Sequence, residues 1–331
     1  MTRLFATALS ILAVLNSCLA APPTLDELRK ELKSFGPHKK LSKEDKKKRS
    51  RVQGQITALE SKDSIEKFVK TLKAHPVKKD RKILIYSRTT GFRHASIPTG
   101  VLAISLLGEH TGAYSSDATE DPSVFTKENL AQYDAILMLS TTKDPIPHGK
   151  ARDAFEDFLT QGKGLIGIHA ATDCHADWPY YLDAIGGIFN GHPWTSKDLI
   201  TLYNEEPEHP VVKSVPQGYV IKDEIYQYKD DEHFTRDKLR ILLSLDLSGK
   251  NMKKKNMRRK DHDYAVSWVK SYHGSKVFYS NLGHNNSTFT DKVAMKHFLD
   301  GIQFVLGDVE ADSRPSAEVG NGKPKAPPAG F

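Results

Sequence analysis

Residues 164–173, "GLIGIHAATD", predict a short apolar strand that ends abruptly at a histidine. "GLIGI" is small and apolar throughout, which is typical of a strand buried inside a parallel sheet. An amphipathic helix pattern at 149–164 leads into it. In many α/β enzymes the residue at such a turn is a nucleophilic serine or cysteine. The imidazole of His169 at this place therefore indicates a different chemistry.

Strands and helices alternate along the chain around this stretch. "KILIYS" (82–87) and "YDAILMLST" (133–141) are strand-like runs, and 96–110 between them has helical spacing. This alternation predicts an α/β fold in which a parallel sheet carries helices on both faces. Further strands are expected in the second half, followed by a closing helix at 291–307: 198–203, 239–246, 264–272 and 275–283.

The positive charge of the chain is concentrated near its N-terminus. Residues 22–82 carry 19 Lys/Arg and 9 Asp/Glu, whereas the whole chain of 331 residues has a net charge of only +7. We therefore expect a basic, helical N-terminal extension at 21–81 and a body at 82–307 that folds without it. A second basic stretch, 249–261, is expected to be an exposed loop. The tail at 308–331 is rich in Pro, Gly and charge, which predicts disorder.

The first 20 residues have the pattern of an export signal. Arg3 precedes an apolar run that is too short for a comfortable membrane span and ends in small residues, as a secretory signal does. We expect cleavage near Ala20 and a periplasmic or extracellular protein. A lipoprotein acylated at Cys18 is the less favoured alternative, and only that form would have a membrane as partner. An exported chain is not expected to bind nucleic acid.

Several polar side chains fall where predicted strands end. Arg93 and His94 follow the strand at 82–87, and His169 and Asp173 follow the strand at 164–168. Ligands of open α/β sheets bind at the carboxyl edge, where these residues should lie. Other candidates stand in or near glycine-marked turns: His192, Glu224, Tyr226 and His284. We expect at least three of the four histidines to converge.

The familiar catalytic and nucleotide-binding motifs do not occur in the sequence. It contains no G-x-S-x-G, no G-x-x-x-x-G-K-[ST], no H-E-x-x-H and no G-x-G-x-x-G. Cys174 stands five residues beyond the turn at His169 and is poorly placed as a nucleophile. Imidazoles with a carboxylate suit general acid/base catalysis near neutral pH. They would also suit Zn²⁺.

Five segments in order resemble the successive signatures of the ThuA-like (trehalose utilisation) family: "TGFRHASI", "GLIGIHAATD", "GGIFNGHPW", "EHPVV" followed by "DEIYQY", and "VFYSNLGH". They span about residues 82–307. The resemblance implies a flavodoxin-like, class I glutamine amidotransferase-like fold and a role with sugars, especially oxidised (3-keto) disaccharides. In amidotransferases the turn corresponding to 168–170 holds a catalytic cysteine. His169 stands there in this chain, so glutaminase chemistry is not expected.

These observations together suggest an exported enzyme that isomerises, eliminates or cleaves a (3-keto) sugar or glycoside. We expect His169 to act as the base and Asp173 or Glu224 to act as acid or orienting group. The residues expected to bind the sugar are Arg93, His94, His192, Tyr226 and His284. No cofactor follows with certainty, and a divalent metal, zinc, would have as candidate ligands His169, His192 and His284. The alternative is a non-catalytic sugar-binding or assembly module of a polysaccharide-processing system, and a homodimer is left open.

Overall fold

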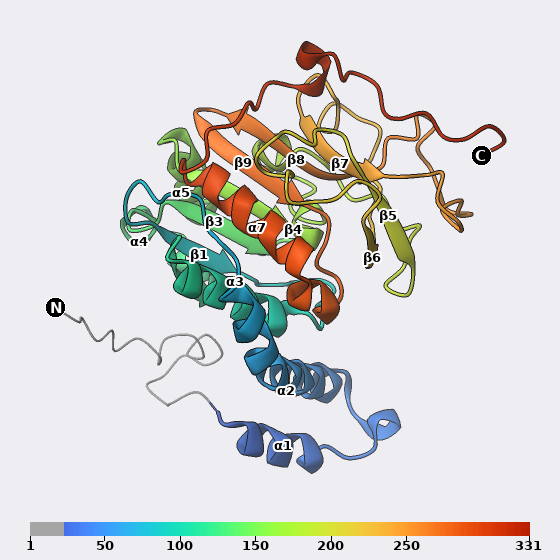
Figure 1. The fold of residues 1–331 in the computed structure, drawn as a ribbon. Coiled ribbons are helices and arrows are strands. Elements are labelled where there is room, and N and C mark those ends of the chain that lie inside the picture. Colours follow the sequence, from blue (N-terminus) through green and yellow to red (C-terminus); the bar gives the residue numbers. More distant parts are fainter. Residues whose placement is uncertain (1–22) are drawn as a thin grey trace.

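The computed structural model describes residues 23–331 (Figure 1). The expected signal peptide at 1–20, with Cys18 and the cleavage site, lies outside the described residues. Within 23–331, no helix combines the length and the apolar character that crossing a membrane requires.

One nine-stranded sheet forms the centre of the molecule, in the order β2-β1-β3-β4-β9-β8-β7-β5-β6. The first five strands of this order pair in parallel. Their bounds are β2 Ser115–Thr119, β1 Lys82–Tyr86, β3 Ala135–Leu139, β4 Gly164–Ile168 and β9 Ser275–Ser280. The carboxyl ends of β1, β3, β4 and β9 therefore lie along one edge of the sheet. Predicted site residues follow these strands in the sequence.

The other part of the sheet is antiparallel. It consists of β8 Ala265–Tyr272, β7 Arg240–Leu245, β5 Leu199–Asn204 and β6 Val220–Lys222. The predicted α/β fold is confirmed, but the sheet is mixed rather than wholly parallel. Only two residues, 273–274, join β8 to β9, and parallel neighbours need a crossover of a dozen residues or more.

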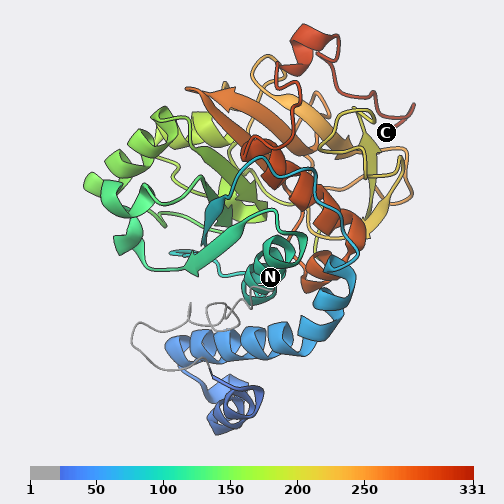
Figure 2. The same cartoon turned by 60° about the vertical axis from the view of Figure 1, so that its left-hand side comes forward.

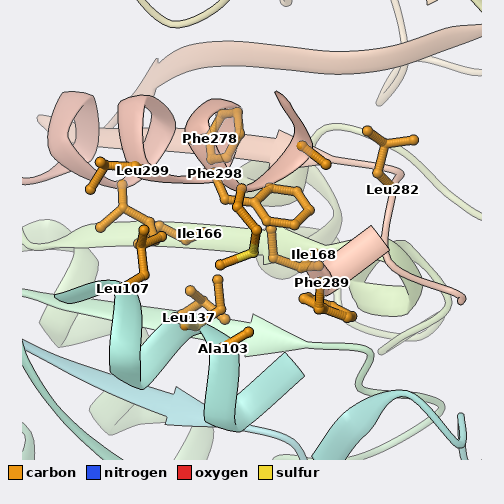
Figure 3. Packing of buried hydrophobic residues seen from close by; sticks show 14 of the residues in the cluster. Ala103, Leu107, Leu137, Ile166, Ile168, Phe278, Leu282, Phe289, Phe298 and Leu299 are labelled. Carbon is orange, nitrogen blue, oxygen red and sulfur yellow. The ribbon is translucent and has the colours of Figure 1, made fainter. Parts of the chain in front are cut away.

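Helices cover both faces of the sheet, as predicted. The helices of one face are α3 Ile97–Thr111 and α7 Lys292–Val305, and those of the other are α4 Lys127–Leu130, α5 Lys150–Thr160 and α6 Pro179–Ile185. Successive strand residues alternate between the faces, so Ile83 packs in the first cluster and Leu84 in the second. Figure 3 shows the first cluster, where Leu107 of α3 and Phe298 of α7 lie near Ile166 of β4.

The N-terminal extension is helical, as predicted, but its second helix is part of the core. It forms α1 Leu25–Ser34 and the long α2 Lys43–Val69, which lie below the sheet in Figure 2. Ile65 and Val69 are completely buried in the cluster that α3 and α7 form with the sheet. Gly54 allows α2 to lie close to the segment after β1, because a Cβ there would stand 3.2 Å from the carbonyl oxygen of Ala95. Side chains of α2 therefore contribute to the core of the body, and independent folding of 82–307 stays a prediction.

The tail at 308–331, expected to be disordered, is packed against the antiparallel part of the sheet. Ser316 pairs with the start of β7: its N–H donates to the carbonyl of Leu239, and its hydroxyl accepts from the N–H of Ile241 at 2.8 Å. The carbonyl of Asn321 accepts from Arg236, a side chain that also pairs with two buried carboxylates. Composition predicted disorder because it does not show that single polar residues of the tail form hydrogen bonds with the rest of the fold.

We expect Ile65→Ala to lower the free energy of unfolding by about 2 to 5 kcal/mol, because it opens a cavity in the core cluster where α2 packs against α3. Chemical denaturation followed by circular dichroism measures this. Val77→Ala, at a side chain that is 40% exposed, is the control and should change stability by less than about 0.5 kcal/mol. Equal effects of the two substitutions would show that α2 lies outside the cooperative core.

Candidate active site

Three histidines reach one place from the carboxyl ends of three parallel strands. His94 follows β1, His169 follows β4 directly, and His284 follows β9. Glu224 and Tyr226 come from the segment after β6. That segment is joined to the loop around His192 by two isolated bridges, Trp194 with Ile225 and Phe189 with Tyr228. The site therefore lies where the parallel and antiparallel parts of the sheet meet.

The turn after β4 holds His169 in a conformation that side chains seldom adopt. Its φ is +53°, and it opens the short 3₁₀ helix His169–Thr172. A left-handed residue with a Cβ costs free energy and is often found at functional sites. Gly283 lies against this turn with φ +128°, where a Cβ would stand 3.0 Å from Ile168. Glycine at 283 thus lets the chain after β9 approach and brings His284 beside His169.

The histidine rings and one carboxylate form a compact cluster. His169 Nε2 lies 3.2 Å from His94 Nε2 and 3.3 Å from His284 Nδ1. Glu224 Oε1 lies 3.0 Å from His284 Nδ1 and 3.8 Å from His169 Nε2. One ligand atom from each of the four residues lies within 4.8 Å of all the others. His94, His169 and Glu224 are buried, and His284 is partly exposed.

The protonation of His169 follows from its neighbours. Its Nδ1 lies 2.8 Å from the carbonyl oxygen of Asn281, which can only accept, so Nδ1 carries the proton. Burial holds the pKa of His169 well below its usual range, and burial lowers the pKa of His94 to about 3. His169 is therefore a neutral ring whose Nε2 lone pair points into the cluster. Either a proton on a neighbouring ring or a bound cation must face that lone pair.

The spacing of the four atoms fits a small divalent cation. Zinc bonds to imidazole nitrogen and carboxylate oxygen are about 2.1 Å long, so donors at the corners of a tetrahedron are about 3.4 Å apart. Four of the six separations lie between 3.0 and 3.8 Å and bracket this value, and the other two are at most 4.8 Å. The donor set also has the required chemistry, because neutral imidazoles and a carboxylate are ordinary zinc ligands. Among the residues that could hold a metal, His94 takes the place that the sequence analysis gave to His192.

Asp223, which the sequence analysis did not place in the site, holds the His284 turn. Its carboxylate is buried and accepts the backbone N–H groups of Gly283 at 2.7 Å and Asn285 at 3.0 Å. It also accepts from the hydroxyl of Thr288 and the N–H of Glu224. Burial raises the pKa of Asp223 to about 6, against the effect of these donors. One side chain thus fixes two of the cluster residues, Glu224 and His284, relative to each other.

Two further predicted residues lie beside the cluster. The hydroxyl of Tyr226 lies 3.4 Å from His94 Nε2, and its ring lies against that of His169 with centroids 4.5 Å apart. His192 is 48% exposed, and its Nδ1 lies 3.3 Å from Glu224 Oε2. Glu224 therefore faces the cluster with one oxygen and the more exposed His192 with the other.

Two other predicted residues are engaged elsewhere. The guanidinium of Arg93 pairs with Glu120 at 2.6 Å, and Arg51 of α2 lies on the other oxygen of that carboxylate. Asp173 pairs with Lys143 at 3.1 Å. Cys174 is buried, and burial raises the pKa of its thiol, so it is not prepared to act as a nucleophile.

A second group of possible metal ligands, Asp144, His148 and Asp177, lies on the surface. Its centre is already taken by a cation, because Arg152 lies 3.1 Å from Asp177 and 3.2 Å from His148. The group is a surface ion-pair network, and we do not assign a metal site to it.

The protein is an α/β protein with a mixed sheet and a histidine-rich site at the carboxyl edge of that sheet. Residues 82–305 match the family described as ThuA, trehalose utilisation, and the chain belongs to this family. Two solved structures of ThuA-like proteins resemble it. The one from Bacteroides uniformis is 25% identical with a TM-score of 0.58 and covers 70% of this chain and 94% of its own. The one from Parabacteroides merdae is 19% identical with a TM-score of 0.56. The match covers 71% of this chain and 93% of the other chain. No curated protein matches the chain.

We expect Asp223→Asn to lower the free energy of unfolding by about 1 to 3 kcal/mol, because the amide group would face buried donors that now donate to an oxygen. Thermal and denaturant unfolding measure this. The control is Asp231→Asn, in a half-buried turn where one oxygen accepts from the N–H of His233. If both variants unfold like the wild type, the Asp223 carboxylate does not hold the turn.

Proposed function

We propose that this ThuA-family protein is an exported carbohydrate-active enzyme that works through the cluster of His94, His169, Glu224 and His284. Its substrate would be a (3-keto) sugar or glycoside, which it would isomerise, eliminate or cleave. The family supports a carbohydrate-related role. Export rests on the pattern of residues 1–20. The observation that carries the proposal is the convergence of three ring nitrogens on one buried carboxylate oxygen.

The chemistry of an oxidised sugar matches these groups. A keto sugar has an acidic C–H beside its carbonyl, so a base must remove that proton and an acid must stabilise or protonate the oxygen. His169 can act as the base only through Nε2, since Nδ1–H is held by Asn281, and the proton that a neighbouring ring holds toward this lone pair must first move away. Glu224 can exchange the proton with solvent through His192, because its two oxygens face the two sides. The hydroxyl of Tyr226 can donate to a substrate oxygen.

The same cluster would hold a divalent metal through His94, His169 and His284, with Glu224 as a fourth ligand or as the acid/base group beside it. Bound there, zinc would act as a Lewis acid on the sugar carbonyl or hydroxyls. The residues that position the cluster keep their tasks in either case. Asn281 fixes the ring of His169, Asp223 fixes the turn of His284, and Tyr226 orients His94.

The test of the proposal is His169→Gln, assayed on keto-disaccharides by product analysis. We expect turnover to fall by about 10²-fold or more, the usual scale for a positioned acid/base group. The folded state should lose only about 1 to 2 kcal/mol. His273→Gln is a matched control, since His273 is exposed and shares the left-handed backbone with φ +47°. A wild-type protein that binds keto-disaccharides without converting them would instead identify a sugar-binding module.

Metal binding gives a separate prediction. We expect the purified protein, reconstituted with Zn²⁺ and desalted, to retain about one zinc per chain by elemental analysis. His94→Gln, His169→Gln and His284→Gln should each lose it, because each removes one nitrogen of the cluster. His192→Gln should keep it, since the contact of His192 with the cluster is to the outer oxygen of Glu224. Retention of zinc by all three cluster variants would place the metal elsewhere or leave the cluster to acid/base chemistry alone.

A further inference from the structure

The basic loop at 249–260 has the most concentrated charge of the body. It contains seven Lys/Arg and no Asp/Glu, although residues 83–331 as a whole have a net charge of −4. Five of its cations are exposed and form no ion pair with a carboxylate of the described residues: Lys250, Lys253, Lys255, Arg258 and Lys260. The other two are neutralised, Lys254 by Asp198 and Arg259 by Asp261.

This loop is fastened along the segment that carries His192. The indole N–H of Trp194 donates to the carbonyl of Met252 at 3.1 Å. Lys254 pairs with Asp198 at 2.6 Å. The guanidinium of Arg258 donates to the side-chain oxygen of Asn190 at 2.8 Å. These three contacts place the loop beside both ends of the 190–198 segment, so its position relative to the site is fixed.

Gln227 links the basic loop to the strand segment that carries Glu224 and Tyr226. Its side-chain oxygen accepts from the backbone N–H of Arg258 at 2.7 Å, and its amide donates to the carbonyl of Asn256 at 2.8 Å. Its own N–H donates to the carbonyl of Gly191. The guanidinium carbon of Arg258 lies 3.9 Å from the position that a Cβ of Gly191 would take. A positive charge thus stands next to the residue that precedes His192.

We infer that this loop binds the acidic groups of an anionic carbohydrate, one that carries sulfate or carboxylate substituents, while a neighbouring sugar residue occupies the histidine cluster. The inference rests on the proposed function and names its substrate class. Sulfate and carboxylate oxygens accept charge-assisted hydrogen bonds from Lys and Arg. Several cations on one loop also attract a polyanion from a distance. A solubilising loop would not need three separate contacts with the His192 segment, one of which holds the unpaired cation of Arg258 beside Gly191.

Calorimetric titration of the full chain tests the inference. The probes are a sulfated and a uronic-acid oligosaccharide, each with its neutral counterpart of equal length, at low and high salt. We expect the wild type to bind at least one acidic probe about tenfold more tightly than its neutral counterpart, and the preference to shrink at high salt. The acidic probe that binds more tightly identifies the substituent.

Two loop variants and one control make the test specific. The first loop variant combines Lys253→Gln, Lys255→Gln and Arg258→Gln and should remove most of the preference. The second combines Lys250→Gln, Lys255→Gln and Lys260→Gln. It leaves Arg258 and its contacts in place and should also remove most of the preference. The control removes three exposed charges from α2: Lys43→Gln, Lys47→Gln and Lys48→Gln. It should keep the preference. A preference that survives in both loop variants, or its absence in the wild type, would overturn the inference.

Two further outcomes separate this inference from its alternatives. If duplex DNA or anionic vesicles bind as tightly as the acidic oligosaccharides and weaken equally in the loop variants, the loop is a general polyanion surface and the inference is wrong. Turnover of neutral keto sugars without an acidic preference would overturn the inference and leave the proposed function standing. A clear acidic preference without turnover of any probe would support the inference and overturn the proposed function.

Discussion

The hydrogen bond from His169 Nδ1 to the carbonyl oxygen of Asn281 joins β4 to β9 at their carboxyl ends. It fixes the ring in one tautomer and directs its Nε2 toward His94 and His284. The bond forms only because His169 adopts a left-handed turn and because glycine at 283 lets the two turns touch. The direction of the His169 lone pair and the spacing of the cluster depend on this junction, whereas burial keeps the ring neutral.

The sequence predicted the parts of the fold in which apolar pattern and burial agree. Strands β1, β3, β4 and β9 are apolar runs buried on both faces, so their pattern is unambiguous. Strand β2, "SSDAT", was missed because an edge strand with partly exposed polar residues has no apolar signal. The tail was predicted to be disordered because its few anchors, Ser316 and Asn321, are polar and isolated.

The candidate site could be predicted as a set of histidines but not as a geometry. Strand ends indicated His94, His169 and His284, because carboxyl ends of parallel strands share an edge. Glu224 was expected to lie near them, but nothing local showed that His192 would lie on its outer oxygen. Asp223, next to Glu224, was given no role in the site, because it acts by accepting backbone N–H groups of residues some 60 positions further along. Such pairing is decided by tertiary structure, and a single sequence does not contain its pattern.

The cluster is costly to the fold, which is the strongest reason to assign it a function. Three imidazoles and a carboxylate occupy a position where apolar side chains would pack without loss of hydration, and burying unpaired polar atoms lowers stability. His169 adds backbone strain, and burial suppresses the protonated forms of His94 and His169. Asp223 is likewise buried at a site where its charge is disfavoured. A core that only had to be stable would gain from replacing these groups, so their arrangement supports the proposal that they serve a function.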